Sequence, residues 1–213
     1  MLNVLSVVGS VAFAVSGAMV AIEEDYDLFG ILVLGFITAF AGGMIRNLIV
    51  GLPVAPVWHQ TGPFLAALGA MLVAIVVPSS WMASTRWLIA LFDAAGLSTF
   101  AVQGALYAAG AHLPVGAVII AAMMTGIGGG IIRDLLAQRK PLVLRADAYA
   151  VWTLLAGAVI AFGWVNSHVA WQIYALLTGT FVLRCLSMIL HWKLPHVKRS
   201  GEGDIGLQHP IDG

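Results

Sequence analysis

The stretch Gly128-Gly129-Gly130-Ile131-Ile132-Arg133-Asp134 has a near copy 87 residues earlier, Ala41-Gly42-Gly43-Met44-Ile45-Arg46-Asn47. Each copy places consecutive glycines three residues before an arginine, inside a long apolar run. The same offset carries Thr38 onto Thr125 and residues 9–21 onto residues 96–108, with matching glycines, alanines and phenylalanines. One unbroken register across two apolar runs indicates an internal repeat.

The composition of the whole chain is that of a membrane protein. Of its 213 residues 61% are hydrophobic and 9% are charged, whereas about 25% are charged in ordinary soluble domains. Ten basic and ten acidic residues cancel, which argues against a basic surface for nucleic acid. Cys185 is the only cysteine, and the six histidines show no ligand spacing. We therefore expect no nucleic-acid partner, no metal site and no cofactor.

Seven apolar runs have about the 20 residues that a helix needs to cross a hydrocarbon core about 30 Å thick. They cover residues 3–22, 28–50, 64–77, 87–109, 115–137, 148–165 and 169–192. No basic segment and no cleavage site mark the first run as a signal peptide, so we expect it to stay as a span. The sequence predicts an all-α membrane protein with seven transmembrane helices in one domain, 1–192, and a disordered cytoplasmic tail, 193–213.

The repeat unit contains three spans, about residues 3–80 and about residues 87–165, and the span at 169–192 is extra. Because three is an odd number, the second copy must be inverted relative to the first. Inverted repeats are typical of transport proteins, whose site lies near the membrane midplane between the copies.

Lysine and arginine distribution predicts the orientation in the membrane. The loops on one side carry none, whereas the other side has seven: Arg86, Arg139, Lys140, Arg145, Lys193, Lys198 and Arg199. The positive-inside tendency therefore predicts that the N-terminus lies outside and the C-terminus in the cytoplasm.

The two arginines are the clearest candidates for function, because a charge within a span is costly unless it faces a partner or water. Thr38, Gly42 and Arg46 share one helical face, as do Thr125, Gly129 and Arg133. Glycine runs weaken a helix, so we expect both spans to bend and to free carbonyl groups toward a wet cavity. Two other interpretations stay open: the glycines can serve close helix packing, and the arginines can reach out to the headgroups.

The fourth span supplies the acidic partner. Asp93 lies well inside it and shares one side of that helix with Thr99 and Gln103, while the first span offers Ser16. A buried carboxylate can neutralise either arginine, and the pattern does not decide which one.

Together the two Gly-Gly-x-x-Arg-Asp/Asn motifs, the stretch from Asp93 to Ala105 and the unpaired seventh span resemble prokaryotic members of the TRIC family. These trimeric intracellular cation channels have bacterial relatives that carry a "glycine transporter" label. The resemblance covers about residues 3–190. It implies a homotrimer with a separate cation pathway in each protomer, bounded by kinked spans two and five. The first copy departs from the family pattern at Ala41 and Asn47, and Ala12-Phe13-Ala14 lacks a glutamate that many relatives have.

We therefore expect a homotrimeric channel in the inner membrane of a bacterial cell, in contact with membrane lipid. We expect it to pass monovalent cations, chiefly K⁺, with Na⁺ as a second permeant ion. The expected pore-lining or gating residues come from the two motifs and from spans one and four: Ser16, Thr38, Gly42, Gly43, Arg46, Asn47, Asp93, Thr99, Gln103, Thr125, Gly128, Gly129, Gly130, Arg133 and Asp134. The alternative is a secondary transporter of a small zwitterion such as glycine, with an arginine binding its carboxylate. An enzyme is not expected, because no nucleophile with a base and no paired catalytic aspartates are present.

Overall fold

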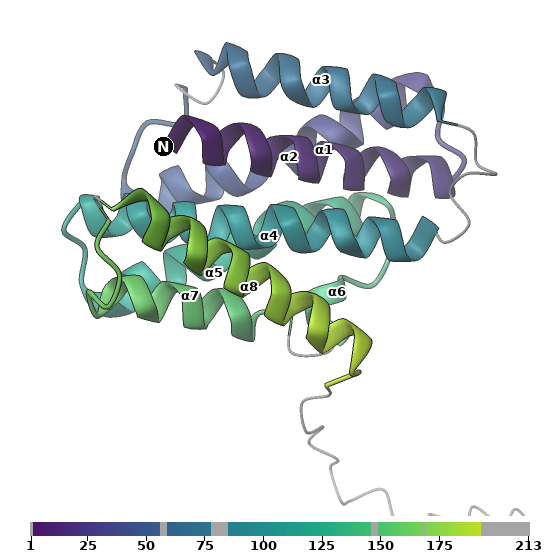
Figure 1. Ribbon diagram of the computed structural model, residues 1–213. Helices are drawn as coiled ribbons and strands as arrows, with labels where there is room; N and C mark the ends of the chain where they lie inside the picture. Colours follow the sequence, from purple (N-terminus) through teal and green to yellow (C-terminus); the bar gives the residue numbers. More distant parts are fainter. Residues whose placement is uncertain (1, 56–58, 78–84, 146–148, 168, 193–213) are drawn as a thin grey trace, which may run out of the picture.

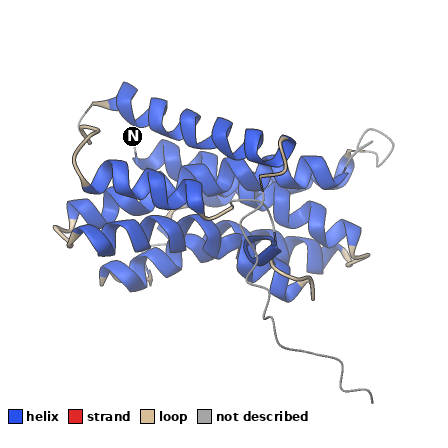
Figure 2. Cartoon of the chain, turned by 90° about the horizontal axis from the view of Figure 1, so that it is seen from below, coloured by secondary structure: helices blue, strands red, loops and turns tan. Residues whose placement is uncertain are grey.

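The computed structural model describes residues 2–55, 59–77, 85–145, 149–167 and 169–192, and this part of the chain is all helical (Figures 1 and 2). The predicted tail, 193–213, lies outside the described residues. The helices are α1 Leu2–Glu23, α2 Leu28–Val50, α3 Thr61–Val76, α4 Thr85–Gly110, α5 Val115–Leu136, α6 Leu142–Arg145, α7 Val151–Ala161 and α8 Ala170–Ile189. Five of them, α1, α2, α4, α5 and α8, are long and apolar enough to cross a membrane.

The third helix of each repeat is shorter than a full span. Helix α3 has 16 residues and α7 has 11, so α7 is only about 16 Å long at 1.5 Å per residue. The predicted span at 148–165 was therefore too long at both ends. Gly163 adopts a positive φ of 72°, and the amides of Gly163 and Trp164 bond back to Ile160 and Val159. This glycine-centred cap ends the helix before the apolar sequence ends.

The two repeats run in opposite directions, and their equivalent helices pack on each other, α1 on α4 and α2 on α5. In Figure 1, α1 runs from the labelled N-terminus toward the opposite end of the bundle, and α4 runs back the other way. Each first helix packs against the two that follow it, α1 on α2 and α3, and α4 on α5 and α7. The predicted inverted three-helix repeats with one extra helix are confirmed.

Contacts at the centre of the bundle come in pairs related by the 87-residue offset. The rings of Phe13 and Phe100 pack on each other with centroids 5.4 Å apart. A Cβ added at Gly9 would strike Phe100 at 2.7 Å, and one at Gly96 would strike Phe13. Because equivalent residues meet each other, the pseudo-twofold axis passes between the two phenylalanines.

Candidate functional site

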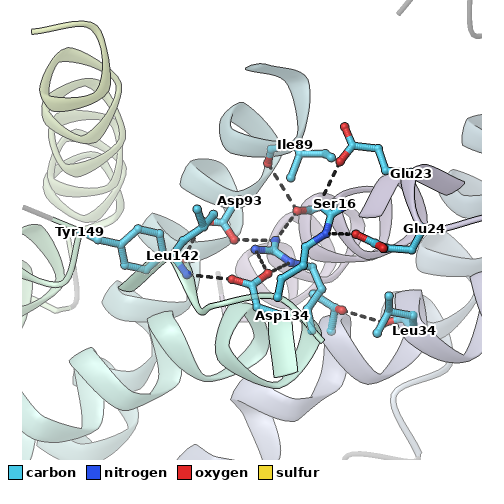
Figure 3. Close-up of polar contacts among 12 residues, drawn as sticks. Ser16, Glu23, Glu24, Leu34, Ile89, Asp93, Asp134, Leu142 and Tyr149 are labelled. Carbon is cyan, nitrogen blue, oxygen red and sulfur yellow. Dashed lines mark hydrogen bonds and ion pairs between the residues drawn. The ribbon is translucent and has the colours of Figure 1, made fainter. Parts of the chain in front are cut away.

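The guanidinium of Arg133, on α5, lies at the centre of a fully buried polar cluster (Figure 3). Its Nη1 donates to Asp93 Oδ1 of α4 at 2.7 Å and to Ser16 Oγ of α1 at 2.5 Å. Its Nε donates to Asp134 Oδ1 at 2.8 Å, and Asp134 Oδ2 accepts the backbone amide of Leu142 at 2.9 Å. Three helices thus meet at one arginine, which answers the pairing question: both aspartates face Arg133.

Two residues that the sequence analysis missed extend this cluster toward α8. The hydroxyl of Tyr149 donates to Asp93 Oδ2 at 2.5 Å. The guanidinium of Arg184, on α8, stacks on the ring of Tyr149 with its Cζ 4.6 Å from the centroid. Arg184 is 3% exposed, so the extra seventh span contributes a buried charged residue to this cluster although most of that helix is not buried. A lone arginine within that apolar run was the signal that could have identified it.

Arg46, on α2, lies at the other end of the bundle in a cluster of neutral groups. Its Nη1 donates to Gln103 Oε1 at 3.0 Å, and its Nε and Nη2 donate to Asn47 Oδ1 at 3.0 and 2.9 Å. Gln103 Nε2 donates to Ser6 Oγ at 2.6 Å. The guanidinium carbon lies 3.9 Å above the ring centroid of Tyr107. Arg46 is 3% exposed, so neither arginine reaches out to the headgroups.

The two clusters use equivalent positions but differ in charge. Under the 87-residue offset, the Asp93, Asp134 and Ser16 that surround Arg133 correspond to the Ser6, Asn47 and Gln103 that surround Arg46. One arginine is therefore balanced by two carboxylates. Among the described residues, the other has no carboxylate within ion-pair distance.

The glycines do not open α2 and α5, contrary to expectation. Both helices run without interruption through their glycine motifs. The glycines allow close approach instead: a Cβ at Gly42 would lie 2.5 Å from the carbonyl oxygen of Thr125, and one at Gly129 would collide with that of Thr38. Backbone contact across the α2–α5 crossing requires residues without side chains, so the packing interpretation holds here.

The predicted hydroxyl ligands are turned toward their own helices. Thr38 and Thr125 are fully buried and donate to Leu34 and Ala121 carbonyls at 2.6 and 2.5 Å. Thr99 donates to the carbonyl of Ala95 at 2.7 Å in the same way. Their oxygens remain able to accept, but Thr38 and Thr125 lie at the packed α2–α5 crossing, and none of the three threonines bonds to Arg46 or Arg133.

A cavity of about 480 Å³ leads to the Arg133 cluster at the end of the bundle where the 24–27 and 137–141 loops meet. We call it the vestibule. Arg139 bridges it by ion pairs with Glu23, at 2.9 Å, and with Glu24. Burial alone would lower the pKa of Arg139, but hydrogen bonds to Glu24 and Glu23 raise that pKa above its ordinary value. The vestibule is lined by charges of both signs: Glu23, Glu24, Arg86, Arg133, Asp134, Arg139 and Lys140.

A second, much smaller cavity of about 10 Å³ adjoins Arg46. Its lining combines polar side chains, from Ser6, Ser10, Gln60, Gln103 and Arg46 itself, with the apolar residues Ala39, Phe40, Gly43 and Phe100. Between the two cavities lies the close-packed α2–α5 crossing. The structure therefore brings the predicted polar residues other than the threonines together as two separate clusters, one toward each end of the bundle.

Comparison with known proteins identifies the family to which this chain belongs. The glycine transporter family matches the chain twice, over residues 3–79 and 90–166, one match for each repeat. The chain belongs to this family. It is 48% identical to the UPF0126 membrane protein YvgT of Bacillus subtilis (strain 168), over 91% of this chain and 95% of that one. It is 32% identical to the UPF0126 inner membrane protein YadS of Escherichia coli (strain K12), over 90% and 93%.

Solved structures of prokaryotic TRIC channels share the fold of this family member. One, a prokaryotic TRIC channel crystallised in 0.5 M KCl, matches with a TM-score of 0.83 at 32% identity, over 91% of this chain and 98% of that one. Another is the trimeric intracellular cation channel orthologue from Rhodobacter sphaeroides, with a TM-score of 0.77 at 31% identity, over 89% and 97%. The resemblance to the TRIC family is confirmed, and the chain is a multi-pass membrane protein.

Proposed function

We propose that the protein is a homotrimeric channel for monovalent cations, chiefly K⁺, with one pathway in each protomer between α2 and α5. The observation that carries the proposal is the fold shared with TRIC cation channels over 91% of the chain. Membership among channels also argues against an enzyme. The trimer is proposed because a structural neighbour is named a trimeric channel.

The vestibule supports entry of cations from the side that the positive-inside tendency assigns to the cytoplasm. Glu23, Glu24 and Asp134 supply negative charge along it. Arg133 then closes the path, because its guanidinium is held between Asp93, Asp134 and Ser16. Conduction requires this guanidinium to move aside. A unit charge that crosses 100 mV gains about 2.3 kcal/mol, so such a movement makes opening sensitive to voltage.

The geometry favours a channel over the alternative, a transporter of a zwitterion such as glycine. A transporter of that kind needs an arginine available to the substrate carboxylate. Arg133 already binds two carboxylates of its own chain, and the cavity beside Arg46 has only about 10 Å³, which is the space of one water molecule.

Planar-bilayer recording of the purified protein under a KCl gradient tests the proposal. We expect unitary currents whose reversal potential is shifted from zero toward the equilibrium potential of K⁺. Arg133→Gln should raise the open probability, whereas Arg139→Gln, in the vestibule, should leave it near the wild-type value. Saturable glycine uptake without unitary currents would contradict the channel and support the transporter.

A further inference from the structure

Arg46 is a buried cation without a counter-ion in the described part of the chain. Arginine stays protonated in proteins, and an unbalanced charge within the membrane is costly. The amide oxygens of Asn47 and Gln103 and the ring of Tyr107 offer dipoles, but dipoles leave the net charge in place. The equivalent arginine of the other repeat, Arg133, has two carboxylates.

Donors remain available around this charge. Asn47 and Gln103 accept from Nε, Nη1 and Nη2 of Arg46, which accounts for three of the five N–H donors of a guanidinium. Ser10, which is 3% exposed and lines the small cavity, makes no side-chain hydrogen bond to the described part of the chain. Gly43 leaves room beside the charge, since a Cβ there would lie 3.9 Å from Arg46 Nη2.

We propose that this cavity is a binding site for a small monovalent anion of the chloride type, held by the guanidinium of Arg46 and the hydroxyl of Ser10. The volume, about 10 Å³, is the space of about one water-sized particle, so a single small ion fits it better than phosphate, a carboxylate or a lipid headgroup does. A water molecule satisfies the same donors but leaves the positive charge unbalanced. The anion supplies to Arg46 the negative charge that Asp93 and Asp134 supply to Arg133.

Thermal unfolding of the purified full chain in detergent tests the site, with chloride replacing gluconate at constant ionic strength. We expect the wild-type Tm to rise by roughly 3 °C when chloride reaches ten times its Kd, and to keep rising with the logarithm of the chloride concentration above that. Gln103→Glu places a carboxylate where an amide oxygen now lies 3.0 Å from Arg46 Nη1. This variant should have a raised Tm in gluconate and no further response to chloride.

Two further variants separate the site from a general salt effect. Arg46→Gln should lose the chloride response, whereas Arg139→Gln, which removes a vestibule arginine, should keep it. If Arg46→Gln fails to fold, Gln103→Glu decides the matter. A wild-type Tm that is the same in chloride and gluconate, or an equal chloride response in Gln103→Glu, would overturn the proposal.

Crystals grown in sodium bromide give a direct second readout. We expect an anomalous bromide peak within hydrogen-bond distance of Arg46 Nη atoms in the wild type and none in Gln103→Glu. The absence of that peak in the wild type, in crystals with bromide in the solvent, would also overturn the site. Neither experiment measures ion flow, so failure here is distinct from failure of the proposed channel.

Discussion

Both carboxylate oxygens of Asp93 are used inside the bundle, one by Arg133 at 2.7 Å and the other by Tyr149 at 2.5 Å. An ion pair at 1% exposure is stable only if its remaining lone pairs are satisfied. The Tyr149 hydroxyl therefore fixes the carboxylate in the orientation that holds Arg133. It is a positioning residue for the Asp93–Arg133 ion pair, although it lies outside both glycine motifs.

Tyr149→Phe should lower the stability of the protein because it leaves Asp93 Oδ2 buried without its donor. A hydrogen bond to a charged group contributes about 1.5–3 kcal/mol, which corresponds to a Tm decrease of roughly 3–12 °C for a chain of this size. Tyr107→Phe is the matched control, since Tyr107 uses its ring against Arg46 and the variant keeps that ring. Thermal unfolding in detergent measures both, and equal decreases would contradict the role of the Tyr149 hydroxyl.

At the level of helices, the glycine motifs act as contact surfaces between α2 and α5. A Cβ at Gly129 would overlap the carbonyl of Thr38 and reach the ring of Phe13 at 3.0 Å. We expect Gly129→Ala to force the crossing apart and to cost about 1–3 kcal/mol, as overpacking does elsewhere. Gly69→Ala on α3 is the control, because nothing lies within 4 Å of an added Cβ there. If both variants unfold at the wild-type temperature, the crossing is not close-packed.

Helix α8 connects to the Arg133 cluster through the stack of Arg184 on Tyr149. Its Ser187 also accepts from Trp152 Nε1 of α7 at 3.1 Å. A movement of α8 relative to α7 would therefore be transmitted to Asp93 through the side chain of Tyr149. In the channel that we propose, the extra helix, which has no counterpart in the repeat, would therefore affect how firmly Arg133 is held.

Arg184→Met should raise the open probability while leaving the unitary conductance unchanged, because Arg184 lines neither cavity but holds Tyr149 in place. Single-channel recording separates the two quantities. Cys185→Ala, one residue further along α8, should change neither. A lower conductance in Arg184→Met would instead place this arginine in the ion path.

For the whole molecule, the 87-residue repeat was a better guide to the structure than the predicted ends of the apolar runs were. The register correctly predicted two inverted three-helix repeats, whereas the contact of Thr38 and Gly42 with their copies replaces the wet cavity expected between them. Helix ends were harder: the cap at Gly163 stops α7 before the apolar run stops. Tyr149 was not predicted as a site residue. Its equivalent in the first repeat is Gly62, so the internal repeat did not point to a side chain at this position.

For a similar reason, the sequence could not predict which polar residues bind each of the two arginines. Asp93 and Gln103 are ten residues apart on α4, so they lie nearly three turns apart. Whether Asp93 or Gln103 contacts Arg133 depends only on how far α4 is shifted along its axis relative to α5. That shift is set by close contacts such as Gly104 against Thr125, which no composition or periodicity specifies.

The orientation of the bundle in the membrane is the remaining prediction for the whole molecule. Loops 24–27 and 137–141 share one end, as the Arg139 ion pairs show, and the 51–55 and 111–114 loops lie at the other (Figure 1). In a Cys185→Ala background, Lys140→Cys should react with a membrane-impermeant maleimide only after cells are opened. Ala55→Cys and Ala111→Cys, both exposed in the structure, should react in intact cells. The reverse pattern would place the vestibule outside and would move the proposed anion site at Arg46 to the cytoplasmic end.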